Sequence, residues 1–315
     1  MQKTAKQKNS LIGNKNVRLW KEIKKHKSIY MIFLPTLLFY IIFLYAPMFG
    51  NVIAFQNYSI TRGIFGSKFV GLKNFIDFLT NYKFFQLLRN TLVINIMGLV
   101  FSFPAPIILA LLLNEVHSLK FKKLVQTVTY MPYFISNVVM VGILNVFVSS
   151  DGIINTIRAL FGQEVISFMT ESKFFPAIYT ICDIWQGIGW GSIIYIAAIA
   201  SVDQSLYEAA MIDGAGRWRQ CIHITIPGIA ATIILLLIMR IGQMLSTGYE
   251  KIILMYNPAI YDTADVISTY VYRRGLIDGD YSYSTAVSMF NSVCNFILLM
   301  SANAMSKKIT GDGIW

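Results

Sequence analysis

Two charged residues, Asp183 and Arg240, lie inside long apolar stretches of the sequence. If these stretches cross a bilayer, an isolated charge there costs about 2.5–3.5 kcal/mol on insertion scales, so each side chain needs a partner or water. We expect the two to form an ion pair between neighbouring helices, beside a hydrated cavity. The pair could contact a polar substrate or only fix the two helices together, and the sequence leaves both roles open.

Polar and aromatic residues surround this pair along the sequence. Asp183, Gly187 and Trp190 recur at i, i+4 and i+7, a spacing that puts them on one face of a helix. An aromatic ring can cover the apolar C–H surface of a sugar, while carboxylate, amide and guanidinium groups meet its hydroxyls. The candidate substrate pathway consists of Asp183, Gln186, Gly187, Trp190, Arg240 and Gln243. The structural alternative is an interfacial aromatic belt for Trp190 and ordinary helix packing for Gly187.

A second group of residues lies in the polar stretch 208–227, EAAMIDGAGRWRQCIHITIP, between two long apolar segments. Ser205-Leu-Tyr-Glu208 has the spacing of a capping box and predicts a short helix that begins at the serine. Gly214 and Gly216 should end this helix, because glycine adopts left-handed backbone angles without steric cost. We expect Pro227 to open the next helix at a position that needs no N–H donor.

The composition places the chain among integral membrane proteins. Of its 315 residues 55% are apolar and only 14% are charged, against about 25% charged in a soluble domain. Six apolar stretches have roughly the 20 residues that a helix needs to span a bilayer. They cover residues 29–49, 87–113, 125–148, 174–200, 228–247 and 284–305, with bends expected at Pro104, Pro106 and Pro132. We therefore predict an all-α membrane protein with six transmembrane helices.

The distribution of Lys and Arg predicts the orientation in the membrane. Basic residues gather in the amino-terminal tail, in the turn after the second helix, in the stretch 208–227 and at the carboxyl terminus, and the positive-inside rule puts all four in the cytoplasm. The net charge of +11 is then explained by the basic residues of the cytoplasmic segments, and nucleic acid is not an expected partner. The predicted regions are a basic cytoplasmic tail (1–28), a first helix with an external loop (29–85), a five-helix core (86–306) that includes the loop 203–227, and a cytoplasmic tail (307–315).

The sequence has no motif for enzyme chemistry or metal binding of its own. It contains no GxxxxGK[ST] loop for a nucleotide phosphate, no HExxH and no GxSxG. His26, His117 and His223 lack metal-ligand spacing, and the three cysteines form no CxxC pair. We expect no catalytic site, no metal and no cofactor. If ATP drives transport, ATP and Mg²⁺ bind to separate subunits.

The stretch 208–227 resembles the EAA loop of permease subunits in binding-protein-dependent ABC importers. In that family EAA is followed by a glycine and then, after nine residues, by isoleucine, any residue, an aliphatic residue and proline; here these are Glu208-Ala-Ala, Gly214, Ile224, Ile226 and Pro227. The resemblance covers about residues 28–315. Within the family, the chain is similar to the polysaccharide, lipoprotein-transport-like branch, which includes alginate and pectin-fragment importers. The segments that carry it are Asp151-Gly-Ile-Ile-Asn155, Asp183-Ile-Trp-Gln-Gly-Ile-Gly-Trp190, Gly248-Tyr-Glu-Lys-Ile-Ile-Leu-Met-Tyr-Asn-Pro258 and Gly313-Ile-Trp315.

This resemblance implies a type I ABC importer permease fold in a bacterial cell membrane, in contact with lipid. It implies a heterodimer with a second homologous permease, two ATPase subunits and an extracytoplasmic solute-binding protein that delivers oligosaccharides. In the family the EAA loop docks on the ATPase, and sugar contacts lie about one helix before and one helix after it. The residues that match the docking segment are Glu208, Ala209, Ala210, Asp213 and Gly214.

Two other function classes compete with this interpretation. An ion-coupled secondary transporter of a polar solute is the main alternative, but it usually shows inverted repeats, and it leaves the EAA pattern unexplained. A membrane enzyme such as a glycosyltransferase would need clustered carboxylates, for which the candidates are Asp262, Asp265, Asp278 and Asp280. Contact with a binding protein is a simpler expectation for those four.

A polar stripe on the sixth predicted helix is the last candidate. Asn291 and Asn295 lie at i, i+4, beside Ser288 and Ser292. We expect these side chains mainly to form hydrogen bonds between helices, with a pore-lining role as the second interpretation.

Overall fold

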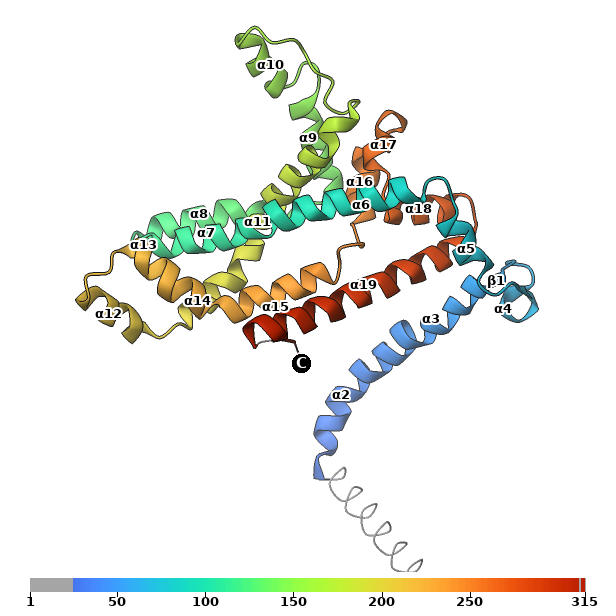
Figure 1. Ribbon diagram of the computed structural model, residues 1–315, viewed down its shortest axis with the longest axis horizontal. Helices are drawn as coiled ribbons and strands as arrows, with labels where there is room; N and C mark the ends of the chain where they lie inside the picture. Colours follow the sequence, from blue (N-terminus) through green and yellow to red (C-terminus); the bar gives the residue numbers. More distant parts are fainter. Residues whose placement is uncertain (1–24, 312, 315) are drawn as a thin grey trace, which may run out of the picture.

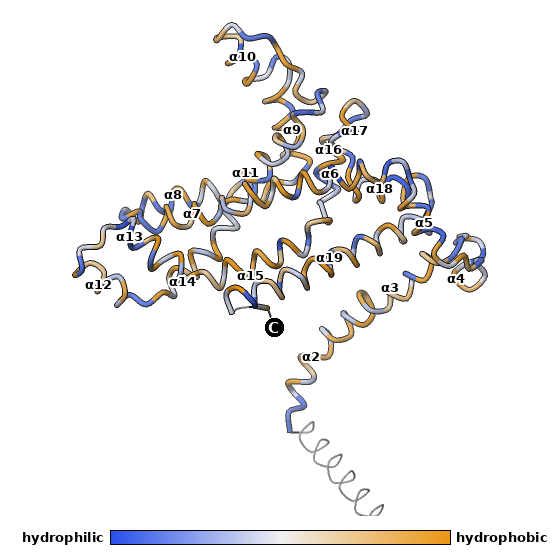
Figure 2. Tube along the Cα trace, viewed as in Figure 1, coloured by the Kyte–Doolittle hydropathy of each residue, from blue (hydrophilic) through white to orange (hydrophobic). Residues whose placement is uncertain are grey.

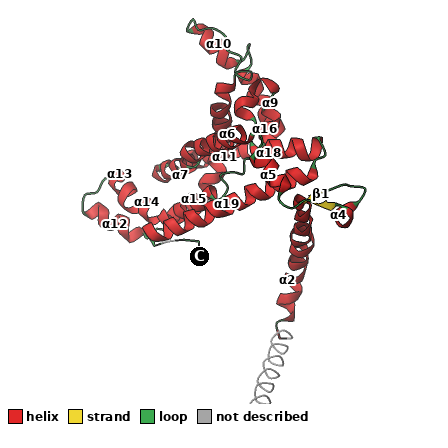
Figure 3. Ribbon diagram, turned by 45° about the vertical axis from the view of Figure 1, so that its right-hand side comes forward, coloured by secondary structure: helices red, strands yellow, loops and turns green. Residues whose placement is uncertain are grey.

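The computed structural model describes residues 25–311, 313 and 314, so most of the predicted tail 1–28 lies outside it. The described chain is mostly helical (Figures 1 and 3). Four helices are long and apolar enough to cross a membrane: Lys27–Phe55, Phe84–Glu115, Asn137–Leu160 and Tyr281–Thr310. There are also two bent pairs, Ser172–Ala200 with Gln204–Ile212 (70°) and Arg217–Gly228 with Ala230–Ile241 (60°), and the count rises to six if each pair is one span. Figure 2 shows hydrophobic residues along the long helices and hydrophilic ones near their ends.

The first span stands apart from the rest of the described chain (Figure 1). It consists of α2 (Lys27–Phe39), a π-helical turn (Tyr40–Tyr45), α3 (Ala46–Met48) and a 3-10 segment (Phe49–Phe55). Every residue from 27 to 49 is exposed, and Ala54 is the first buried one. The span therefore joins the remaining helices only at its carboxyl end, where it packs on α19 (Tyr281–Thr310).

The predicted loop after this span contains short regular elements. A two-stranded antiparallel sheet pairs β1 (Gln56–Asn57) with β2 (Lys68–Phe69), and α4 (Gly63–Gly66) and α5 (Lys73–Leu79) flank β2. The Tyr58 backbone N–H donates to Ser282 Oγ at 2.8 Å, which ties the loop to the start of α19.

The second span is one long helix that contains a π-helical turn. It runs through α6 (Phe84–Met97), the π turn Gly98–Ser102 and α7 (Pro104–Glu115). The sequence predicted a bend at Pro104, and the wider π turn lies directly before it. A proline lacks the N–H that an α-helical turn would use, and a π turn is one way to accommodate that loss.

The predicted third helix, 125–148, is not one continuous helix, and the bend expected at Pro132 is confirmed as a full break. The structure has α8 (Leu119–Tyr130), a 3-10 turn (Met131–Phe134) and a separate α9 (Asn137–Val148), followed by α10 (Ile153–Leu160). Pro132 lies in the turn, and the Ser136 hydroxyl accepts the Val139 N–H at 3.4 Å and caps α9. The chain therefore changes direction: α8 packs against the helix Phe175–Ala200, and α9 points away from the bundle (Figure 1).

The helices from residue 175 onward complete the bundle. They are α11 (Phe175–Ala200), α12 (Gln204–Ile212), α13 (Arg217–Gln220), a π turn (Cys221–Thr225), α14 (Ile226–Gly228), α15 (Ala230–Ile241), α16 (Tyr249–Met255), α17 (Tyr261–Ala264), α18 (Ile267–Tyr272), a second π turn (Arg273–Ile277) and α19. The predicted start of a helix at Pro227 is wrong, because the helical segment already begins at Arg217 and bends only after Gly228. The predicted helix to residue 247 ends at Ile241, and the polar segment beyond it folds into α16–α18.

Candidate substrate pathway and coupling surface

A cavity of about 490 Å³ lies between α6, α11, the end of α15 and the start of α16. Its polar lining includes Asn95, Asp183, Arg240, Gln243, Glu250 and Lys251. Two of these side chains are acidic and two are basic, so the site can hold a ligand rich in hydroxyl or carboxylate groups.

Asp183 forms its ion pair with Lys251, so the predicted pair with Arg240 is wrong. Lys251 Nζ lies 3.3 Å from Asp183 Oδ1, and only 11% of the lysine side chain is exposed. The ammonium group also lies 5.7 Å from the centre of the Tyr179 ring. Lys251 lies beyond the predicted helix 228–247, but the chain turns back after α15, and α16 carries the lysine to α11.

Arg240 lines the same cavity, and within the described part of the chain no acidic side chain pairs with it. Its Nη2 would lie 2.7 Å from a Cβ placed on Gly98, in the π turn between α6 and α7. A residue with a side chain at this position would push the guanidinium away. The absence of a Cβ at Gly98 therefore makes room for an unpaired cation in the cavity.

A second hollow of about 390 Å³ adjoins the first and shares Asp183, Arg240 and Gln243 with it. Gly187 also lines this hollow, together with apolar residues such as Pro106 and Leu236. Four of the six predicted pathway residues are therefore brought together by the fold.

Gln186 and Trp190 do not line either hollow. The Gln186 side chain donates to the Ile135 carbonyl at 3.1 Å, and the Trp190 ring stacks on Tyr133 with centroids 4.7 Å apart. Trp190 remains 45% exposed. The residues of α11 that line the second hollow include Gly187, Gly191 and Tyr195, and Trp190 lies at the edge of this face, toward the turn before α9.

An irregular segment, residues 242–248, separates α15 from α16 and was not foreseen in the sequence. Asn295 Oδ1 accepts the Leu245 N–H at 2.9 Å, Asn95 donates to Thr247 Oγ1 at 2.7 Å, and Ser268 donates to the Thr247 carbonyl at 2.7 Å. Non-helical backbone inside a membrane protein requires such partners. Asn295 bonds to another element as expected, but its partners lie in this non-helical segment rather than in a helix. These bonds fix the segment that delivers Lys251 to the cavity.

The short helix α12 forms a tip at the end of the bundle opposite α4 and α5 (Figure 1). Glu208, Ala209, Asp213 and Gly214 are exposed, and Ala210 is half-buried. Gly214 has φ +74° and ends the helix as predicted, whereas Gly216 is the N-cap of α13.

The predicted capping box at Ser205 is wrong, because α12 begins one residue earlier. Asp203 is the N-cap, and its carboxylate accepts the Ser205 N–H at 3.0 Å. This hydrogen bond lowers the pKa of Asp203 below its usual value. Glu208 therefore does not cap α12, and it lies exposed on the tip.

Residues 102–311 match the family described as binding-protein-dependent transport system inner membrane component. The chain belongs to this family. It is 45% identical to protein LplB of Bacillus subtilis over 306 residues, which covers 97% of this chain and 96% of LplB. It is 46% identical to the polygalacturonan/rhamnogalacturonan transport system permease protein YteP of the same organism over 302 residues, covering 96% and 94% of the two chains.

Solved structures agree with the family. In the crystal structure of a bacterial alginate ABC transporter in complex with an alginate pentasaccharide-bound periplasmic protein, one chain is 41% identical and superposes with a TM-score of 0.87. The alignment covers 94% of this chain and all of that one. The chain is therefore a multi-pass membrane permease, the pore-forming subunit of an ABC importer with the type I fold, and it has no ATPase site of its own.

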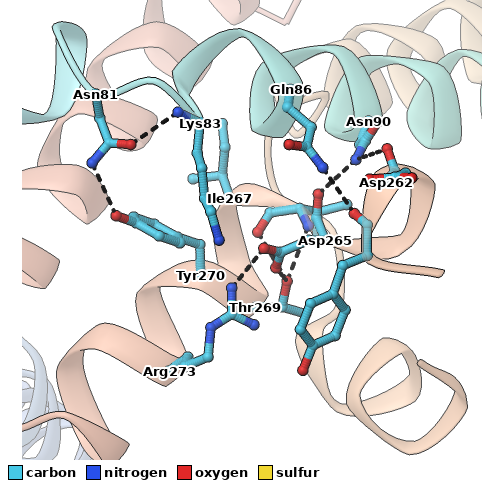
Figure 4. A network of polar contacts seen from close by, with 12 residues as sticks. Asn81, Lys83, Gln86, Asn90, Asp262, Asp265, Ile267, Thr269, Tyr270 and Arg273 are labelled. Atoms are coloured by element: carbon cyan, nitrogen blue, oxygen red, sulfur yellow. Dashed lines mark hydrogen bonds and ion pairs between the residues drawn. The ribbon is translucent and has the colours of Figure 1, made fainter. Parts of the chain in front are cut away.

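Of the four aspartates considered for an enzyme, Asp265, Asp278 and Asp280 have their carboxylates in structural ion pairs. Asp265 is 2% exposed; its Oδ2 lies 2.6 Å from Arg273 Nη2, and its Oδ1 accepts the Thr269 hydroxyl at 2.9 Å (Figure 4). Arg274 bridges Asp278 at 3.3 Å and Asp280 at 3.0 Å.

Asn90 on α6 completes this network. Its side chain donates to the backbone carbonyls of Asp262 and Asp265, at 2.9 and 3.0 Å (Figure 4). The backbone carbonyls of Asp262 and Asp265 therefore fix α17 and the start of α18 against α6. In the described residues no group of His, Cys, Asp and Glu side chains is arranged to hold a metal ion.

Proposed function

We propose that this permease imports oligosaccharides across a bacterial cell membrane. The observation that carries the proposal is the charged cavity beside α11, where carboxylate, guanidinium, ammonium and amide groups converge. Groups of this kind suit the hydroxyls of a sugar chain. The names of the relatives give further support, since one concerns polygalacturonan and rhamnogalacturonan and another alginate.

The proposed importer contains a second homologous permease, two ATPase subunits and an extracytoplasmic solute-binding protein. ATP and Mg²⁺ bind to the ATPase subunits. The periplasmic protein in the alginate transporter supports a binding-protein partner. The α12 tip lies on the cytoplasmic side in this arrangement, as do both termini, and α4 and α5 lie on the outer side. The exposed first span supports a partner in the membrane, because its apolar side chains need lipid or a second subunit around them.

The α12 tip is the proposed coupling element. Residues 208–214 of this tip, all exposed except the half-buried Ala210, dock in a groove of an ATPase subunit, and Glu208 meets a basic residue there. The helix is connected directly to α11 and, through α13 and α14, to α15, so a displacement of α12 moves two helices that line the cavity.

Co-purification in detergent tests the proposal. Affinity purification of the permease from its native membrane should bring a second permease and an ATPase, and ATP hydrolysis should rise when the glycan-loaded binding protein is added. Uptake that persists without the ATPase and disappears with the ion gradient would instead establish the ion-coupled transporter.

A further inference from the structure

Two stacked tyrosines lie where the charged cavity meets a third depression of the surface. Tyr249 is the first residue of α16 and lines both the cavity and a groove of about 560 Å³ between α18 and α19. Tyr272, the last residue of α18, lines the same groove. Their rings are 5.4 Å apart at an interplanar angle of 22°. We infer that the Tyr249–Tyr272 pair is a stacking site for a sugar ring of the transported glycan, an inference that rests on the proposed function.

The groove has the chemistry of a sugar site. Its walls carry hydroxyl and amide groups, supplied by Ser268, Ser284, Thr285, Ser288, Asn291 and Ser292. Several of these hydroxyls donate to backbone carbonyls, as Ser292 does to Ser288 at 2.9 Å, so their oxygens remain free to accept. Asn291 Oδ1 has no hydrogen-bond partner among the described residues. A sugar ring matches such a wall, because hydroxyls surround its edge while its C–H faces are apolar.

The tyrosine pair is preorganised for this contact. Tyr249 follows directly on segment 242–248, which Asn95, Ser268 and Asn295 hold by hydrogen bonds. Tyr272 covers one side of the Tyr249 ring, and Tyr249 is still 41% exposed. A ring that is already fixed loses little conformational entropy when a ligand stacks on it.

The position of the pair explains how a sugar chain could pass along the permease. The groove, the charged cavity and the second hollow form a sequence: Tyr249 is shared by the first two, and Asp183, Arg240 and Gln243 by the last two. The groove reaches Asn51 and Tyr281, near α4, and the second hollow reaches Tyr195 on the α12 side. A glycan residue on the tyrosines would therefore be next to the charged groups that receive it.

The test compares two exposed aromatic residues in the reconstituted importer, with second permease, ATPase and binding protein. The variants are Tyr249→Leu, Tyr249→Phe and, as a matched control outside the three depressions, Trp190→Leu. The probes are radiolabelled trisaccharides of galacturonate, mannuronate and neutral arabinose. The measured quantity is the number of trisaccharides imported per ATP hydrolysed, which a purely structural contact would not change in an assembled complex.

We expect Tyr249→Leu to lower this ratio about 3- to 10-fold, the range of one lost aromatic contact, with ATP hydrolysis unchanged. Tyr249→Phe should keep the wild-type ratio, because the ring face is retained, and so should Trp190→Leu. A normal ratio in Tyr249→Leu, or a loss confined to Trp190→Leu, would overturn the inference. Failure of both Tyr249 variants to assemble would assign the ring to a subunit contact instead. A wild-type importer that hydrolyses ATP but imports none of the probes would refute the proposed function as well.

Discussion

The ion pair between Asp183 and Lys251 predicts a measurable coupling between α11 and α16. Two unit charges 3.3 Å apart attract by about 5 kcal/mol at an effective dielectric constant of about 20. Desolvation of the buried lysine opposes most of this attraction, and Asp183, whose side chain is 34% exposed, is partly screened by water. We therefore expect a net coupling free energy of about 1–2 kcal/mol.

A double-mutant cycle with Asp183→Asn and Lys251→Met measures this coupling. The free energy of unfolding of the assembled complex is obtained by denaturant titration in detergent, for both single variants and the double variant. The comparison cycle uses Asp183→Asn and Arg240→Gln, for which we expect a coupling of about 0.5 kcal/mol or less, because no ion pair joins those residues. A coupling near zero for Lys251, or a larger one for Arg240, would refute the assignment of the pair.

Three further predictions concern the cavity and the α12 tip. Arg240→Gln should reduce import of galacturonate oligomers about tenfold relative to neutral oligomers, because it removes the unpaired cation; equal losses for both probes would contradict a carboxylate contact. Gly98→Ala should displace the Arg240 guanidinium and lower import per ATP while assembly, measured by size-exclusion chromatography, stays normal. The pKa of Asp203 is lowered in the folded protein, so its ionised carboxylate stabilises α12 fully at pH values above the ordinary pKa of about 4. This stabilisation is lost as the pH falls through the folded-state pKa. Asp203→Asn should keep slow amide exchange in α12 over this whole range and Asp203→Ala should lose it at every pH.

The sequence predicted the long helices well because their signal is local. A run of about 20 apolar residues identifies a span from its own composition, and α11 and α19 lie where expected. The exposed α12 and the end of that helix at Gly214 also follow from neighbouring residues. Each of these features depends on side chains within a few positions of one another.

The errors at the charged cavity concern features that depend on distant contacts. Lys251 lies in a polar stretch, and nothing near it in the sequence shows that segment 242–248 folds inward and is held by Asn95, Ser268 and Asn295. The partner of Asp183 was missed for the same reason. Trp190 was placed with Asp183 on one ideal helical face, but the packing of Tyr133 against its ring decides where it lies.

The solitary first span has a consequence for the life of the chain before assembly. Residues 27–49 contribute nothing to the chain's own core, so the free energy that holds this helix in place comes from its surroundings. The stability of the permease is therefore a property of the membrane and of the complex together. In a copy synthesised in excess of its partners, this apolar helix is covered by lipid alone.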